Sequence, residues 1–405
     1  MTLLDQLPQR SGLDRLWRFL PGARLVGGSV RDLLLGGQHV HDLDLATPEP
    51  PHEVQALLED AGIKTIPTGL AHGTITALID RIPYEITTLR RDVATDGRHA
   101  EVAWTTDWQE DAARRDFTIN AMFCDRFGVI HDYFGGRSDL AACRVRFVGE
   151  AGRRIEEDAL RILRFFRFDA RFGGDRPDPE AMTAIRGLAG MIGGLSAERL
   201  ASEMLRILTG PHLARCLDHM EAADVLDRII ASPQTERLVR GLSLGVPEDG
   251  VLRLGLLSDA PDLAERLRLS GKQAQRLALM RGPDRSNKTD IVSPQCDDDA
   301  LRRLLAMVEH QTLLDRSWLL QTQDDKTPPE AWNALRARLI GMERPVFPLA
   351  GRDVLEAGGL PGPAIGVALA SLQAWWRDRG CLPDRKACLA ELKNRLPLSP
   401  QGRER

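Results

Sequence analysis

The part of the sequence that decides the fold reads LVGGSVRD at residues 25–32 and then DLDLA at residues 42–46. The first stretch contains a turn at Gly27, Gly28 and Ser29 that leads into a short helix, and the backbone N–H groups at a helix start suit a triphosphate. Arg31 can reach the same phosphates with its planar guanidinium. A Gly-Gly turn alone is a weak signal, so its meaning depends on the second stretch.

The second stretch predicts a half-buried strand over residues 43–46, in which acidic and apolar residues alternate. Side chains two residues apart in a strand point to the same face, so Asp42 and Asp44 project together. Two like charges this close need a counter-charge, and hard divalent cations prefer oxygen ligands. We therefore expect a site for nucleotidyl transfer with two metal ions; a solvated surface turn fits poorly because Leu43 and Leu45 imply burial.

A third carboxylate on a neighbouring strand is expected to complete the metal site. Residues 74–79 and 84–89 predict a hairpin around Asp80-Arg81, with Pro83 placed where it does not break a central ladder. Glu85 on the second strand is the candidate catalytic acid. The alternative is an acid on the solvent face of the strand.

Polar residues are also dense in the RRDFTIN stretch at 114–120, which precedes an apolar AMF. Asp116 and Asn120, four apart on a predicted helix, would share a face and could bind a ribose or a triphosphate beside Arg115. Helix capping and ordinary salt bridges are the alternative.

A strongly periodic helix is predicted over residues 155–172, ending at Gly173-Gly174. Four arginines of this helix, placed at 100° intervals, fall within one third of its circumference: Arg161, Arg164, Arg167 and Arg171. Most of the apolar residues lie on the opposite side. Such a stripe is usually a solvated face. Arginines without any lysine, however, favour phosphate or base recognition.

The start of this helix offers a donor and an acceptor side by side. Asp158 and Arg161, three residues apart, match the amine donor and ring-nitrogen acceptor that cytosine and adenine both present. Uracil and guanine present the reverse order, and mismatched buried polar groups are costly. Glu157, four residues before Arg161, is expected to hold the guanidinium in place. An intrahelical salt bridge is the alternative.

Composition limits the function classes. A chain of 405 residues suggests two to four domains, and 43% hydrophobic with 28% charged residues is ordinary for a globular protein. Aromatic residues make up 5%, which argues against a broad base-stacking surface, and the net charge of −4 means that a phosphate-rich partner would meet local basic patches.

Six scattered cysteines lack the spacing of a zinc site, which favours reduced, buried thiols in a cytoplasmic protein. We find neither a signal peptide nor an apolar run long enough for a membrane span. Strand signals nearly vanish after residue 150, so the fold class is α+β: a small mixed sheet followed by helices. Residues 282–299 are the best linker candidate.

With these motifs the chain resembles the class II tRNA nucleotidyltransferases, the family of CCA-adding enzymes and bacterial poly(A) polymerases. The resemblance covers residues 1–210 and rests on four motifs, at residues 27–32, 42–44, 115–120 and 157–161. The DYFGG turn at 132–136 is similar too, and weaker likeness continues at 267–272 and 362–366.

The resemblance implies a seahorse-shaped protein with a catalytic head at 1–140, a helical neck at 141–210, a helical body at 211–285, and a linker and tail at 286–405. It implies that Asp42 and Asp44 bind Mg²⁺ and that Glu157, Asp158 and Arg161 form a protein template for the base. The expected partners are CTP, ATP and the 3′ end of tRNA, whose backbone would meet Arg167, Arg266, Arg268 and Lys272; no oligomeric state is predicted.

Residues 90–104 fall where the family has a flexible loop that takes part in the switch from C to A addition, which favours complete CCA addition. The alternatives are a poly(A) polymerase, an A-adding partner enzyme, or a non-catalytic tRNA-binding relative. A Gly-Arg-Arg-Phe type segment, which marks bacterial poly(A) polymerases, does not follow Asp44; TGLAHG stands at 68–73 instead. The helical C-terminal half lacks a His-Asp dyad, so no second, hydrolytic activity is expected.

Overall fold

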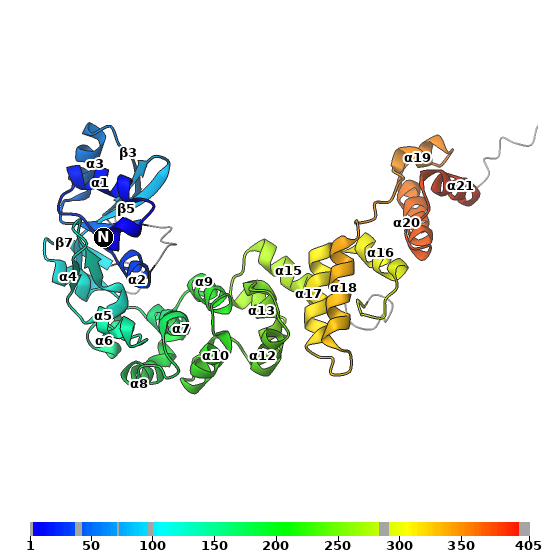
Figure 1. Ribbon diagram of the computed structural model, residues 1–405. Helices are drawn as coiled ribbons and strands as arrows, with labels where there is room; N and C mark the ends of the chain where they lie inside the picture. Colours follow the sequence, from blue (N-terminus) through cyan, green and yellow to red (C-terminus); the bar gives the residue numbers. More distant parts are fainter. Residues whose placement is uncertain (1–2, 37–42, 71–72, 96–99, 283–290, 397–405) are drawn as a thin grey trace, which may run out of the picture. The chain divides into compact units, whose positions relative to one another are not determined.

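The computed structural model describes residues 3–36, 43–70, 73–95, 100–282 and 291–396, which divide between two compact units, residues 1–233 and 234–405 (Figure 1). The first unit combines sheet and helices. Within the described residues the second is helical only, so the predicted α+β class is confirmed. The finer division at residues 140, 210 and 285 stays a prediction.

The elements of the first unit are, in chain order, η1 Leu3–Gln6, α1 Arg10–Phe19, β1 Arg24–Val26, α2 Gly28–Leu34, β2 Leu43–Thr47, α3 Pro51–Asp60, β3 Lys64–Gly69, β4 Thr74–Ile79, β5 Ile82–Thr88, β6 Arg90–Thr95, β7 Ala100–Trp104, α4 Trp108–Ala113, η3 Thr118–Asn120, β8 Met122–Cys124, β9 Ile130–Asp132, α5 Gly136–Ala141, α6 Ala151–Glu157, α7 Leu160–Phe172, α8 Pro179–Leu188, η4 Ala189–Gly194, α9 Ala197–Leu208, α10 Leu213–Ala222 and α11 Leu226–Ile229.

Those of the second unit are α12 Thr235–Ser243, α13 Gly250–Leu257, α14 Leu263–Arg266, α15 Gly271–Arg281, α16 Asp298–Met307, α17 His310–Gln321, α18 Pro329–Gly341, α19 Gly351–Glu356, α20 Pro363–Asp378 and α21 Arg385–Arg395.

The main sheet of the first unit has the strand order β3-β4-β5-β2-β1-β8-β9. Strands β2 and β5 run parallel, whereas the other neighbours are antiparallel. The β4–β5 hairpin is as predicted, and Asp80 and Arg81 at its turn both have positive φ, as a two-residue type I′ turn requires. The parallel pairing of β2 with β5 places Asp44 beside Glu85.

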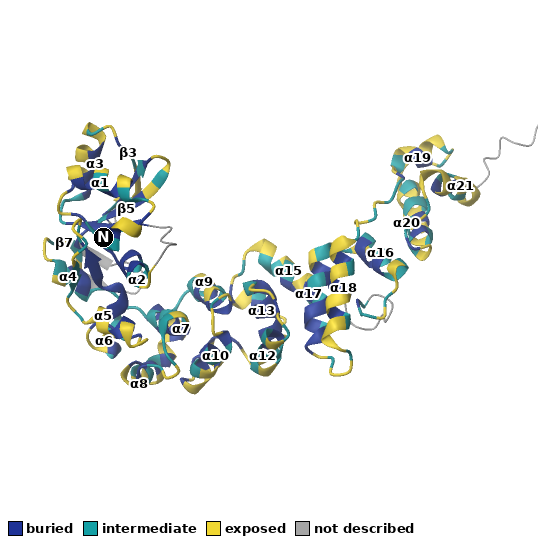
Figure 2. Cartoon of the chain, viewed as in Figure 1, coloured by how far each residue is buried: buried dark blue, intermediate teal, exposed yellow. Residues whose placement is uncertain are grey.

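A small apolar core joins β1, β2, α4 and β8 beneath the glycine turn. It consists of Val26, Ala46, Leu89, Ala112, Ala121, Phe123 and Val148. The central strands β1, β2 and β8 are mostly buried, whereas the edge strand β3 is mostly exposed (Figure 2). Helix α2 contacts β1, β2 and β8, so the turn that precedes it is held against the sheet by burial of apolar surface.

The predicted continuous helix over 155–172 is wrong, because the chain breaks into α6 and α7 at Asp158. This residue has extended dihedrals, φ −156° and ψ 104°, and its carboxylate accepts a hydrogen bond from the Leu160 N–H at 3.1 Å. Asp side chains compete with the helix for backbone donors in this way, and they favour helix starts. A test of apolar spacing does not detect such a break, since both halves keep the same apolar face.

The prediction that Asp116 and Asn120 lie on one helix is also wrong. Phe117 is extended at φ −124° and ψ 148°, and only the short 3-10 turn η3 follows it. Asp116 and Asn120 nevertheless meet, since the Asn120 amide donates to the Asp116 carboxylate at 3.1 Å. The turn contacts α5, where Asp139 is fully buried and accepts a hydrogen bond from the Thr118 hydroxyl at 2.7 Å.

Two further expectations are corrected outside the sheet. The segment expected to be a loop, 90–104, forms two paired antiparallel strands, β6 and β7. The expected linker at 282–299 ends in a helix start rather than in irregular chain: Asp297 caps α16 by accepting from the Ala300 N–H at 2.7 Å. Acidic side chains at a helix N-terminus are favoured by the helix dipole. Residues 283–290 of this segment lie outside the described residues.

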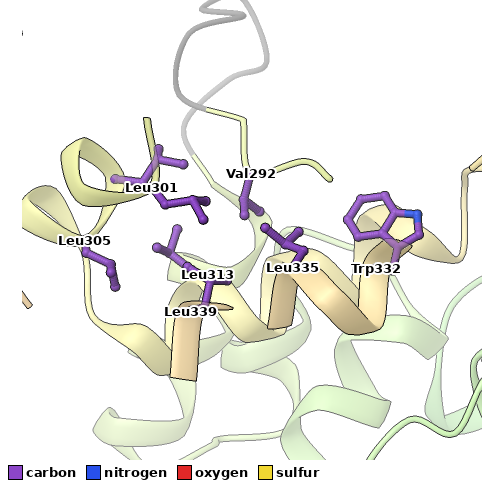
Figure 3. Close-up of a cluster of buried hydrophobic side chains, with 8 residues drawn as sticks. Val292, Leu301, Leu305, Leu313, Trp332, Leu335 and Leu339 are labelled. Atoms are coloured by element: carbon purple, nitrogen blue, oxygen red, sulfur yellow. The ribbon is translucent and has the colours of Figure 1, made fainter. Parts of the chain in front are cut away.

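The second unit contains its own apolar clusters. One of them joins α16, α17 and α18 (Figure 3), where the labelled side chains converge: Val292, Leu301, Leu305, Leu313, Trp332, Leu335 and Leu339. Another joins α19, α20 and α21 around Trp376. Each cluster buries one stripe of each helix, which is the usual source of helix stability in water.

All six cysteines are free thiols, as expected. Burial raises the pKa of the Cys124 thiol to about 12, which suits a structural role. The expectation that all six are buried is wrong for three of them: Cys143 is exposed at a left-handed turn, and Cys296 and Cys381 are only partly buried.

Candidate active site

Most of the predicted nucleotide-binding residues line one pocket of about 430 Å³ in the first unit. Its walls are formed by Gly27, Gly28, Arg31, Asp44, Arg114, Arg115, Asp116, Asn120, Asp158, Arg161, Arg164 and Phe168. The pocket therefore combines the glycine turn, one strand carboxylate and the arginines of α7. Ser29, Glu85 and Glu157 do not line it, and Asp42 lies outside the described residues.

The glycine turn is held in place by contacts to neighbouring strands. Gly27 has φ +65°, a conformation that favours glycine, and its N–H donates to the Met122 carbonyl at 3.2 Å. Ser29 is buried, and its hydroxyl accepts a hydrogen bond from the Asp44 N–H at 3.0 Å. The serine thus fixes the distance between the turn and the acidic strand.

Asp44 and Glu85 form a pair of carboxylates on one face of the sheet. They are direct partners in the parallel β2–β5 ladder, and partners in register project to the same side. Glu85 is exposed and Asp44 is half-buried. Within the described residues no group of three or more His, Cys, Asp or Glu side chains could hold a metal. These two carboxylates supply only oxygen donors, which suits a hard divalent cation.

A chain of hydrogen bonds crosses the pocket floor from α2 to α7. Arg31 Nη1 donates to Asn120 Oδ1 at 2.6 Å, Asn120 Nδ2 donates to Asp116 Oδ1, and Arg164 Nε donates to Asp116 Oδ2 at 2.8 Å. Burial alone would raise the pKa of the Asp116 carboxyl, but the charge of Arg164 and the hydrogen bonds that the carboxyl accepts hold its pKa below the usual range. Asp116 therefore acts as an ionised acceptor that orients two cations.

Aromatic rings complete the positioning of Arg31. Its guanidinium lies over the Phe172 ring, 4.1 Å from the centroid, and 5.4 Å from that of Phe168. Stacked arginine is weakly hydrated and keeps its charge. Neither phenylalanine was predicted to have a role, although both lie on the same helix as the arginine stripe.

Asp111 also has a role in the site that was not predicted from the sequence. It is buried at the end of α4 and pairs with Arg114 and Arg115, with its oxygens 2.8 Å from each guanidinium. Although burial alone would raise the pKa of Asp111, the charges of the two arginines hold it below the usual range. The spacing of three and four residues on a helix was the available signal.

Glu157 positions Arg161, as predicted. Arg161 Nη1 donates to Glu157 Oε2 at 2.6 Å, and Arg154 contacts the other carboxylate oxygen of Glu157 at 2.5 Å. Arg161 also donates to the carbonyl oxygens of Arg154 at 2.9 Å and Arg114 at 3.1 Å. The guanidinium is therefore fixed by one carboxylate and two main-chain acceptors.

Asp158 lines the pocket, but from a different backbone position than predicted. It does not share a helix face with Arg161, because the helix is broken at Asp158 itself. Its Oδ2 instead accepts from Arg199 Nη2 of α9 at 2.7 Å. The two side chains still line the same pocket, so an acceptor and a donor are presented together.

Comparison with known proteins decides the family. The model described as "Poly A polymerase head domain" matches residues 23–146, and "Probable RNA and SrmB- binding site of polymerase A" matches residues 176–238. The human mitochondrial CCA tRNA nucleotidyltransferase 1 is 34% identical over 394 residues, 91% of this chain and 86% of that protein. The chain belongs to the class II tRNA nucleotidyltransferase family.

Bacterial members of this family are also similar to this chain in sequence and in structure. A Streptococcus pyogenes CCA-adding enzyme is 39% identical over 216 residues, which are 53% of this chain and 52% of that enzyme. The crystal structure of the Bacillus stearothermophilus CCA-adding enzyme in complex with CTP superposes with a TM-score of 0.74 at 27% identity, covering 96% of this chain and 97% of that one.

The predicted RNA-binding residues of this nucleotidyltransferase are divided between the two units. Arg167 lies in the first unit, where its Nε is 3.0 Å from a carboxylate oxygen of Glu203 on α9. Arg266, Arg268 and Lys272 are exposed in the second unit. Within the described residues no helix has the length and apolar character needed to cross a membrane.

Proposed function

We propose that this protein adds C, C and A to the 3′ end of tRNA, using CTP and ATP and releasing pyrophosphate. Membership of the tRNA nucleotidyltransferase family supports this function. The observation that carries the proposal is the single pocket in which a glycine turn, a strand carboxylate and a base-reading Asp-Arg pair meet.

The triphosphate lies on the turn of Gly27 and Gly28, and Arg31 binds it. Arg31 is held in the required orientation by Asn120 and by the rings that it stacks on. Family members use divalent metal ions, and we assign Mg²⁺ here to Asp42 and Asp44, with Glu85 beside them. When bound, the metal makes the terminal ribose hydroxyl a better nucleophile and stabilises the departing pyrophosphate.

Asp158 and Arg161 select the base. The carboxylate accepts a hydrogen bond from the exocyclic amine of cytosine or adenine, and the guanidinium donates to the adjacent ring nitrogen. With uracil or guanine, an acceptor faces the carboxylate and a donor faces the guanidinium. Each unpaired group in such a contact costs about 1–3 kcal/mol.

Replacement of Asp158 by alanine is expected to relax nucleotide choice while leaving metal binding intact. Without this carboxylate, the amine of CTP loses its hydrogen-bond acceptor and the carbonyl of UTP is no longer repelled. The preference for CTP over UTP should therefore fall by about 10- to 100-fold. The measurement is the ratio of kcat/KM for the two nucleotides on tRNA that ends before the first C.

Glu156→Ala is the matched control, because Glu156 is an exposed neighbour on α6 that does not line the pocket. Its preference should equal that of the unaltered protein. An Asp158→Ala variant that still rejects UTP in full would show that Asp158 does not read the base.

The tRNA backbone is assigned to Arg167, Arg266, Arg268 and Lys272, so binding should weaken steeply with salt. We also propose a cytoplasmic location; the animal relatives are named as mitochondrial proteins.

The function is tested by incubation of the protein with tRNA that lacks its CCA end and with each labelled nucleotide in turn. We expect incorporation of C and then A that stops after three additions. Long A tails would indicate a poly(A) polymerase, and A addition only to tRNA ending in CC would indicate an A-adding partner enzyme. A folded sample that binds tRNA but incorporates nothing would be a non-catalytic relative.

A further inference from the structure

The Asp158 carboxylate, which we propose reads the base, lies outside any regular helix. Asp158 lies in the break between α6 and α7, with extended dihedrals, so no regular helix fixes its side chain. Two contacts restrain it: Oδ1 accepts from the Leu160 N–H at 3.1 Å, and Oδ2 accepts from Arg199 Nη2 at 2.7 Å. The first contact comes from its own segment. The second comes from a helix 41 residues further along the chain.

Arg199 is well placed to act as a rigid support. It lies in the first turn of α9, and the Ser196 hydroxyl caps its N–H at 3.4 Å. Helix α9 packs on α7, and one turn later Glu203 of α9 lies 3.0 Å from Arg167 of α7. Helix α9 supplies the cation of one ion pair, Arg199 to Asp158, and the anion of the other, Glu203 to Arg167. Together they fix the register of α9 against the base-reading segment.

The contact with Arg199 leaves Asp158 able to bind a base. An ionised carboxylate has about four lone-pair sites, and the two described contacts occupy one on each oxygen. Asp158 still lines the pocket, whereas Arg199 does not. A guanidinium that binds one side of the carboxylate thus sets its rotation without taking the place of the nucleotide.

We propose that Arg199 is a positioning residue for base selection, which acts by holding the Asp158 carboxylate in the orientation that accepts the amine of cytosine and adenine. This inference rests on the proposed function, because it requires that Asp158 reads the base. It makes selectivity depend on α9 as well as on the segment that contacts the nucleotide.

The test uses three variants of the full chain. Arg199→Met keeps the length of the side chain and removes the charged donor; Arg199→Lys restores one donor. Arg206→Met is the control, since Arg206 lies on the same helix and pairs with Glu203, but its side chain is 59% exposed and does not line the pocket. The readouts are the CTP-to-UTP and ATP-to-GTP ratios of kcat/KM, and the thermal midpoint.

We expect Arg199→Met to lower both ratios by about tenfold. A change of this size corresponds to the loss of one partly exposed charge-assisted hydrogen bond. Arg199→Lys should recover much of the loss, and Arg206→Met should change neither ratio. In the double variant Asp158→Ala/Arg199→Met the ratios should equal those of Asp158→Ala alone, because the arginine acts only through the carboxylate.

Two results would overturn the inference. A purely structural Arg199 would lower the thermal midpoint and the rates with all nucleotides while leaving the ratios unchanged. Additive effects in the double variant would show that Arg199 acts independently of Asp158. Failure of the unaltered protein to incorporate C and A would instead contradict the proposed function, so the two failures are distinguishable.

Discussion

Replacement of Asp44 by asparagine is expected to lower nucleotide incorporation by about a thousandfold while the protein stays folded. The carboxylate is half-buried in the pocket, and the amide keeps its size but removes the charge that we propose binds the cation. A loss of about 4 kcal/mol in transition-state stabilisation, which is reasonable for a metal ligand, corresponds to this factor. The rate is measured in a single turnover, with labelled CTP and tRNA that lacks CCA.

The fold is not at risk in this variant. The Asp44 N–H, rather than its side chain, makes the bond to Ser29, and the β2–β5 ladder is formed by the backbone. Asp60→Asn, an exposed carboxylate at the end of α3, serves as the control and should retain full activity. An Asp44→Asn protein within tenfold of the unaltered rate would exclude Asp44 as a metal ligand.

Removal of Asp116 is expected to destabilise the first unit by about 3 kcal/mol. Asp116→Ala leaves the Arg164 guanidinium without its anion and the Asn120 amide and Phe117 N–H without their acceptor. Breaking a buried ion pair from one side costs about 3–5 kcal/mol, and the partial exposure of Arg164 places the value at the lower end. Activity should fall as well, because Asn120 orients Arg31.

Since the chain has two units, the loss is measured locally, by hydrogen exchange of peptides covering residues 111–124 in the full chain. Asp116→Asn keeps one acceptor and should lose less. The double variant Asp116→Ala/Arg164→Met should recover part of the stability, because it leaves no buried charge unpaired. If Asp116→Ala alone left exchange unchanged, the chain of hydrogen bonds would have no energetic importance.

The sequence was sufficient for features that depend on local pattern. The alternation in DLDLA predicted β2, and the glycine turn predicted the start of α2. The Glu157–Arg161 contact followed from a spacing of four residues. In each case the residues concerned are close in the sequence, and Glu157 reaches Arg161 even across the break at Asp158, so a short spacing carries the information.

Features that depend on tertiary packing could not be read in this way. The break at Asp158 leaves the apolar face intact on both sides, so the hydrophobic period continues through it. Asp116 meets Asn120 through a 3-10 turn rather than a helix, and Arg199 reaches Asp158 across 41 residues. Such contacts arise from packing between elements that lie far apart in the sequence. No fixed residue spacing encodes them.

The three acceptors of Arg161 come from separate parts of the chain. Two of them, the Arg154 carbonyl and the Glu157 carboxylate, lie near it in α6, whereas the third is the main-chain oxygen of Arg114, just past α4. Exchange of residues 157–161 alone would therefore keep two of the three acceptors and make the third depend on the host's main-chain path at residue 114. If Arg161 reads the base as proposed, nucleotide preference should depend on that main-chain path as well as on the exchanged residues.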